Sequence, residues 1–354
     1  MPITTIDELH DHLQQAINLE FFVAAPYLYA MYSVADPASE ATKVLKSVAA
    51  EEMLHAALIG NVLLAVGGEP RFYDPSVIAS FPALLPHHDP EVMVNLEPLS
   101  RDLIERVFHV IEEPGDDEDH VDGDSWRFLG QFYKSLEHGI AELGKTTDLF
   151  SNPQIHRQMN DPHGYAAPKY DAGSSGGLRL VETESDADEV IEIVIHQGEG
   201  VSDARFADPD HAELTHYAKF LDLDDETTET ILPAMVNPSL ESLPSEVQPV
   251  AEFSNAIYSY LFVVMDRLMG PDEVDRHHLV GTLYGSMVAL LAPVARYLMT
   301  MPVGDDRVAG PPMGFYQFKN PKDAEAEVRR LGSLLAKNHP VLRPAINLLD
   351  RLPN

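Results

Sequence analysis

Two Glu-x-x-His pairs are the residues of this sequence best suited to chemistry. Glu52 and His55 form one pair, and Glu213 and His216 form the other. Each pair lies in a helix-forming stretch, and residues three apart lie on the same face of a helix. Each pair therefore directs a carboxylate and an imidazole at one point. Helical bundles that hold two metal ions use two such pairs and one Glu from each of two further helices. The sequence predicts a dinuclear metal site.

Glu20 is the predicted partner of the first pair. The sequence predicts a helix over about 4–33, a turn near Pro37, and a second helix that ends at about Val66. A short connection makes these helices antiparallel neighbours. Glu20 lies about 17 residues before the turn and the Glu52 pair about 15 to 18 residues after it, so at about 1.5 Å per residue the side chains lie at similar heights. A buried carboxylate also needs a cation or a metal.

The third helix is predicted over about 124–150 and should supply another carboxylate. Glu137 is the candidate. Gln131 is the alternative inward residue, and in that case the site has lost a carboxylate. A short helix is predicted over 99–112, and we expect no metal ligand there. The fourth helix, over about 208–221, contains the second Glu-x-x-His pair.

The order of the motifs resembles a known family. Glu20 is followed by Pro-Tyr-Leu-Tyr-Ala-Met-Tyr-Ser, and the Glu52 pair by Asn61 and Gly-Gly-Glu-Pro. Gly-Gln-Phe-Tyr, Gln-Gly-Glu-Gly and the Glu213 pair come next, in the expected order. Over about residues 5–300 the sequence resembles the ferritin-like domain of the iminophenyl-pyruvate dimer synthase type. That domain occurs in enzymes of the violacein and rebeccamycin pathways and in stand-alone proteins.

The resemblance implies an all-α fold, a ferritin-like four-helix bundle with additional C-terminal helices and long loop excursions. We expect the metal-binding bundle over 1–224 and a helical extension packed on it over 225–354. Glu199 is typical of the family, and it either binds metal or braces the turn before the fourth helix. The complete predicted set of metal ligands is Glu20, Glu52, His55, Glu137, Glu199, Glu213 and His216.

Carboxylate and imidazole ligands suit iron, with manganese or zinc as alternatives. A dinuclear iron cofactor predicts an oxidoreductase that uses O2 or peroxide on a small organic substrate. The resemblance implies a second function, the coupling of aromatic imino acids in secondary metabolism. A third interpretation is a ferritin-fold scaffold without catalysis.

The charge and composition exclude several classes of protein. A formal net charge of −33 argues against nucleic-acid binding, which needs a basic face. The absence of Cys removes thiolate ligands and a cysteine nucleophile. Because the start of the chain lacks a signal-peptide pattern and the late apolar segment contains Pro293 and Arg296, we expect a cytoplasmic protein with no membrane partner. Assembly into a homo-oligomer remains open.

Overall fold

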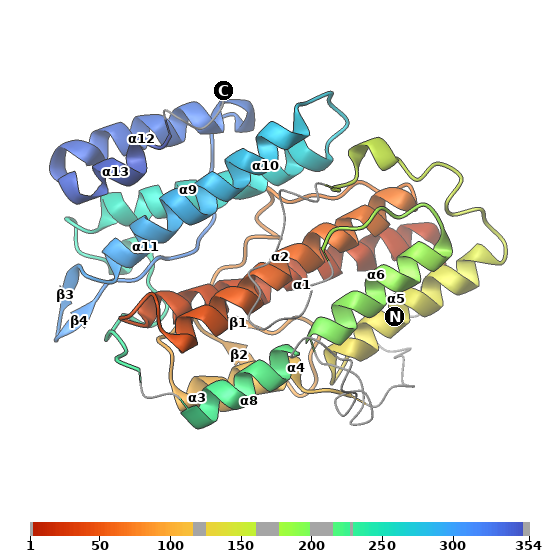
Figure 1. Ribbon diagram of the computed structural model, residues 1–354, viewed down its shortest axis with the longest axis horizontal. Helices are drawn as coiled ribbons and strands as arrows, with labels where there is room; N and C mark the ends of the chain where they lie inside the picture. The colour runs from red at the N-terminus through yellow and green to blue at the C-terminus, as the bar shows by residue number, and fades with distance from the viewer. Residues whose placement is uncertain (1–2, 116–124, 161–176, 199–214, 227–228, 350–354) are drawn as a thin grey trace.

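The computed structural model describes residues 3–115, 125–160, 177–198, 215–226 and 229–349. Within these ranges the protein is mostly helical, which confirms the all-α prediction. Two long helices, α1 (Ile6–Ser33) and α2 (Glu40–Ala65), lie side by side through the centre of the molecule (Figure 1). Their bounds lie close to those predicted from the sequence.

Local signals fix the ends of the two central helices. The Thr5 hydroxyl accepts a hydrogen bond from the Glu8 N–H at 3.2 Å, and the Glu8 carboxylate accepts one from the Thr5 N–H at 2.9 Å. This reciprocal cap fixes the start of α1. The Ser39 hydroxyl caps the start of α2 by accepting a hydrogen bond from the Thr42 N–H. Gly67, with φ +84°, ends α2 in the left-handed region.

Two sets of helices pack on one side of the α1–α2 pair (Figure 1). Helices α5 (Leu129–Gly144) and α6 (Glu184–Gly198) complete a four-helix bundle along part of its length. The other set packs further along the pair and contains α3 (Arg101–Leu103), the π-helical η1 (Ile104–Phe108), α4 (His109–Glu112) and α8 (His216–Glu226). The helix predicted over 124–150 is thus shorter than expected, and the described part of the fourth helix begins at His216.

The C-terminal helices pack on the other side of the central pair (Figure 1). The Phe262 ring of α9 (Gln248–Met269) lies 4.7 Å from the Phe21 ring of α1. A second long helix passes through α10 (Arg276–Tyr284), the π-helical η4 (Gly285–Leu291) and α11 (Ala292–Leu298). The tail forms α12 (Ala324–Asn338) and α13 (Arg343–Ile346). The proposed division near residue 224 stays a prediction.

Short elements join these helices. Two small antiparallel hairpins are formed by β1 (Ala83–Leu84) with β2 (Met93–Val94), and by β3 (Pro302–Gly304) with β4 (Arg307–Val308). Single 3-10 turns lie at η2 (Ile155–Arg157), η3 (Leu240–Ser242), η5 (Pro321–Asp323) and η6 (Pro340–Leu342).

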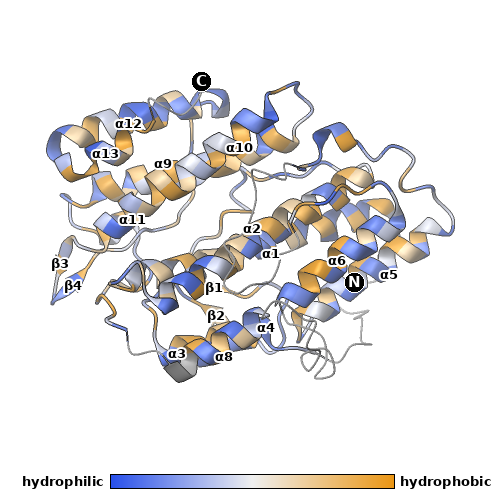
Figure 2. Ribbon diagram, in the orientation of Figure 1, coloured by the Kyte–Doolittle hydropathy of each residue, from blue (hydrophilic) through white to orange (hydrophobic). Residues whose placement is uncertain are grey.

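The apolar residues follow the layers of the fold. Hydrophilic and hydrophobic residues alternate along α5, α6 and α12, as expected for helices with one buried and one exposed face (Figure 2). Helix α2 and the segment Arg276–Leu298 are both long and apolar enough to cross a membrane by length and composition. The apolar window of α2 is 89% buried inside the protein, so its composition is that of a core helix.

Replacing Asn61 with alanine is expected to destabilise the protein by about 2–4 kcal/mol. The buried Asn61 amide donates to the backbone carbonyls of Met159 and Arg179 at 2.9 and 2.8 Å, and it accepts from the Met159 N–H at 2.8 Å. Alanine leaves these three backbone groups without a partner. Urea unfolding measures the loss. The exposed Asn338 is the control, and Asn338→Ala should change stability by less than about 0.5 kcal/mol; equal effects of the two substitutions would contradict this role of Asn61.

Candidate metal centre

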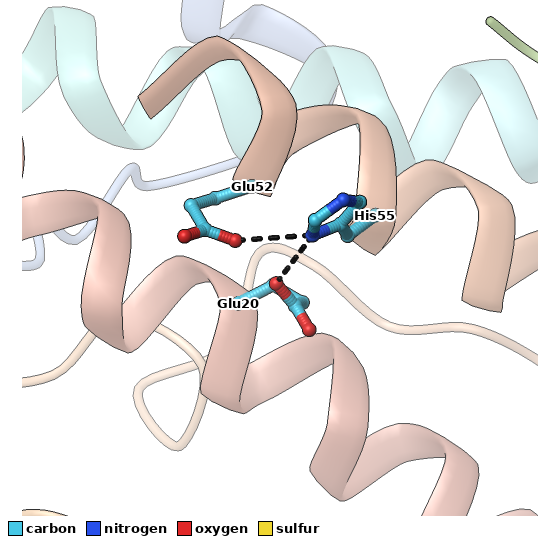
Figure 3. A group of neighbouring side chains, drawn as sticks. All are labelled: Glu20, Glu52 and His55. Carbon is cyan, nitrogen blue, oxygen red and sulfur yellow. Dashed lines mark hydrogen bonds and ion pairs between the residues drawn. The ribbon is translucent and has the colours of Figure 1, made fainter. Parts of the chain in front are cut away.

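The first group of converging side chains contains Glu20 from α1 and Glu52 and His55 from α2 (Figure 3). The His55 Nδ1 lies 3.1 Å from the Glu52 Oε2 and 3.4 Å from the Glu20 Oε2. All three side chains are buried in the core. The structure therefore brings together the three residues that were predicted to lie at similar heights on neighbouring helices.

A second group contains Glu52, Glu112 from α4 and His216 from the start of α8. The His216 Nδ1 lies 3.1 Å from the Glu52 Oε1 and 3.6 Å from the Glu112 Oε2. All three side chains are buried. Glu52 is shared, because its Oε2 belongs to the first group and its Oε1 to the second. The ring centroids of His55 and His216 lie 5.6 Å apart, so the two groups are adjacent.

The far nitrogen of each imidazole has its own partner. The His55 Nε2 lies 2.9 Å from the Gln197 Oε1, and the His216 Nε2 lies 2.8 Å from the Glu51 Oε2. Because amide and carboxylate oxygens only accept, the Nε2 atom is the donor in both rings. The two Nδ1 atoms are therefore directed at the shared carboxylate.

Tyrosine hydroxyls donate hydrogen bonds to the two outer carboxylates, Glu20 and Glu112, each of which belongs to only one group. The Tyr133 hydroxyl of α5 donates to the Glu20 Oε1, and the Tyr27 hydroxyl of α1 donates to the Glu112 Oε1 at 2.6 Å. The other oxygen of each carboxylate, Oε2, faces the imidazole of its group. Hydrogen bonds of this kind fix the orientation of a ligand before a metal binds.

Burial and mutual charge shift the pKa values of the centre. Burial raises the pKa of Glu20 to about 8 and also raises the pKa of Glu112. Burial opposes a charge on Glu52, yet His216 holds the pKa of this carboxyl well below its usual range. Burial likewise opposes a charge on His55, but its hydrogen bonds to Glu20 and Glu52 raise its pKa to about 10. The pKa of His216 is also well above its usual value, chiefly because of the charge on Glu52.

The donor set fits a pair of metal ions. The Glu52 Oε1 and the His216 Nδ1 are buried and have no hydrogen-bond partner, although they face one another. Buried carboxylate oxygens and imidazole nitrogens that converge in this way require protons or a metal cation between them. A Cβ at Gly198 would lie 3.3 Å from the Glu112 Oε2, so the absence of a side chain leaves room beside this carboxylate.

Metal binding at pH 7 is expected to release roughly two to three protons per pair of ions. Without metal, the raised pKa values of His55 and His216 favour the imidazolium form of both rings, and the raised pKa of Glu20 favours its protonated carboxyl. A metal must displace these protons, so affinity should rise as the pH increases toward 10. Calorimetry in buffers of different ionisation enthalpy counts the protons. Binding that releases none and does not depend on pH would contradict this assignment.

The structure places some of the predicted ligands in the two groups and others elsewhere. Glu20, Glu52, His55 and His216 lie together. Glu199 and Glu213 lie outside the described residues. Among the described residues, Glu137 joins neither group, and its carboxylate pairs with the Lys134 Nζ at 2.9 Å.

Neither sequence-based choice for the third carboxylate reaches the centre. The Gln131 amide oxygen accepts from the backbone N–H of Arg127 at 3.0 Å, so this side chain caps the start of α5. Glu112 occupies the expected position instead, from the short helical segment where no ligand was predicted. Its signal in the sequence was weak: Ile104, Phe108 and Glu112 follow at four-residue spacing, so an apolar stripe ends in a carboxylate.

Comparisons with known proteins agree with this architecture. The sequence model of the ferritin-like family matches residues 13–225. A curated relative, the 2-imino-3-(indol-3-yl)propanoate dimerase of Chromobacterium violaceum, is 24% identical over 86% of this chain. The alignment covers 34% of that relative, so the chain spans about a third of its length. The crystal structure of a ferritin-like protein from Caulobacter vibrioides superposes with a TM-score of 0.59 at 19% identity, covering 82% of this chain and 96% of that one.

Proposed function

We propose that this chain, which belongs to the ferritin-like family, binds two iron ions at the paired groups and acts as an oxidoreductase on a small organic substrate. The observation that supports the proposal best is the shared carboxylate of Glu52, whose two oxygens face two imidazoles from different helices. Manganese and zinc suit the same ligand types and are the alternative metals.

Each residue of the centre has a distinct role in this proposal. Glu20 and His55 would hold one ion, Glu112 and His216 would hold the other, and Glu52 would be a ligand available to both. Two bound iron ions would pass electrons from the substrate to O2 or peroxide, so that the substrate is oxidised and the oxidant is reduced. Tyr27 and Tyr133 orient the outer carboxylates, and they leave one oxygen of each for metal.

Aromatic rings exclude water from the Glu112 side of the centre. The Tyr27 ring lies 4.7 Å from the Phe108 ring and 5.1 Å from the Phe220 ring, and these two phenylalanine rings lie 4.9 Å apart. All three side chains are buried. In this dry environment the interactions between ligands and cations are stronger than they would be in water.

Anaerobic loading with Fe(II) tests the proposal. The chain is expected to bind two equivalents and to change its absorption spectrum when O2 is admitted. Binding of less than one equivalent, together with no spectral change, would contradict the proposal. That result would favour the ferritin-fold scaffold without catalysis.

A second candidate function is the oxidative coupling of two aromatic imino acids, and the similarity to the dimerase supports it. Joining two such molecules by a new carbon–carbon bond removes two hydrogen atoms, which O2 or peroxide would accept. The chain is tested with the imino acid that an amino-acid oxidase generates from tryptophan, and mass spectrometry detects the dimer. If a chelator stops dimer formation, the coupling depends on the bound metal. If dimers still form after chelation, the chain couples imino acids without metal.

A further inference from the structure

A buried ion pair lies at the Nε2 atom of the His216 imidazole, on the side of the ring away from Glu52 and Glu112. Lys219 follows His216 by one turn of α8, and its side chain is fully buried, with 0% exposure. The Lys219 Nζ lies 2.7 Å from the Glu51 Oε2 and donates to the Ser47 Oγ at 3.3 Å. The same Glu51 Oε2 lies 2.8 Å from the His216 Nε2. Lysine side chains are almost never buried this completely unless they are paired, so the pair needs an explanation.

The other imidazole has a neutral partner. The His55 Nε2 donates to the amide oxygen of Gln197 at 2.9 Å, from the last turn of α6. An imidazole that donates its far N–H to a carboxylate is a more basic ligand than one that donates to an uncharged amide. The two imidazoles share Glu52, yet they differ in the group behind them.

Among the described residues, the Lys219 ammonium bonds to Glu51 and Ser47, and to neither His216 nor a carboxylate of the two groups. It acts on Glu51, because its ammonium compensates a carboxylate that has no access to water. Ser47 adds a further contact by donating to the Glu51 Oε1 at 3.3 Å. Glu51 is thereby held against the His216 Nε2 even when the His216 Nδ1 has given up its proton to bind metal. A lone carboxylate in that place would be costly.

We propose that Lys219 is a positioning residue that makes the two metal positions unequal, so that the position of Glu112 and His216 fills before the position of Glu20 and His55. This inference rests on the proposed function, since it requires that the chain binds two ions. The difference arises from Glu51 and Lys219 behind one imidazole and Gln197 behind the other.

Titration of the metal-free full-length chain with Co(II), without O2, tests the inference by visible absorption and calorimetry. The unchanged chain should bind in two steps whose Kd values differ by at least about tenfold. Lys219→Met should weaken the first step by about 10- to 100-fold, change the spectrum of the first equivalent and leave the second step unchanged. Gln197→Leu is the matched variant at the other imidazole, and it should weaken only the second step.

A second variant guards against misfolding, because Lys219→Met leaves the Glu51 carboxylate buried without its ammonium. The double variant Glu51→Gln/Lys219→Met replaces the ion pair with neutral side chains and gives His216 an amide partner like that of His55. Its two binding steps should merge to within about threefold, since both imidazoles then donate to amides. Circular dichroism and thermal unfolding of the metal-free variants establish that they are folded.

Two results would overturn the inference while leaving the proposed function intact. One is a single step with two equal sites in the unchanged chain. The other is an equal weakening of both steps by Lys219→Met in a folded protein. Absence of any binding by the unchanged chain would instead contradict the proposed function, and the inference would fall with it. Metal binding by the unchanged chain therefore shows whether the inference alone has failed or the proposed function has failed with it.

Discussion

Glu52→Gln is expected to abolish the binding of both metal ions. Glu52 is the one residue common to both groups, with its Oε2 3.1 Å from the His55 Nδ1 and its Oε1 3.1 Å from the His216 Nδ1. An amide keeps the shape of the side chain, but it removes the charge and turns one oxygen into a nitrogen that donates. The loss of affinity should exceed the roughly 10- to 100-fold that follows from removing a group behind a ligand.

Metal analysis after equilibrium dialysis measures this effect, and circular dichroism of the metal-free variant checks its fold. Glu137→Gln is the matched control, because Glu137 was predicted from the sequence as a ligand but pairs with Lys134 in the structure. The control should retain two ions per chain. A Glu52→Gln variant that still binds two ions, or a Glu137→Gln variant that loses one, would contradict the arrangement of the centre.

The second large effect is expected from Glu112→Gln, which should leave one ion where the unchanged chain binds two. Glu112 belongs only to the group of Glu52 and His216, and its Oε2 lies 3.6 Å from the His216 Nδ1. The position of Glu20 and His55 keeps its ligands in this variant. The reaction with O2 should be lost, because the proposed chemistry uses both ions.

Glu105→Gln provides the control for that experiment. Glu105 lies in the same helical segment, but it is exposed and pairs with Arg101. Stoichiometry and the spectral change with O2 should match the unchanged chain. If Glu112→Gln retained both ions and reacted normally, Glu112 would not be the third carboxylate of the centre.

The first group could be predicted from the sequence because a short turn joins α1 and α2. A short turn fixes which residues lie at the same height on two antiparallel helices, so Glu20 could be matched to Glu52 and His55 by counting. The two central helices followed from their apolar stretches and turn signals, and the all-α fold was implied by the family resemblance. The match between Glu20 and the Glu52 pair depends only on local spacing.

The third carboxylate could not be predicted in this way. A long connection precedes α3, and the π-helical η1 changes the register of the helix before Glu112. Counting along the chain therefore gives neither its height nor its face. On α5, Tyr133 is the residue that reaches Glu20, while Glu137 lies one turn further along and reaches Lys134. The partners Glu51, Gln197 and Lys219 were also missed as a set, because they come from three different helices.

An anomalous difference map from crystals of the full-length chain grown with Mn(II) tests the central claim most directly. The account predicts two peaks, one among Glu20, Glu52 and His55 and the other among Glu52, Glu112 and His216. The same crystals without metal should show neither peak. A map with no peak at these two positions, or with metal bound only elsewhere on the acidic surface, would contradict the account.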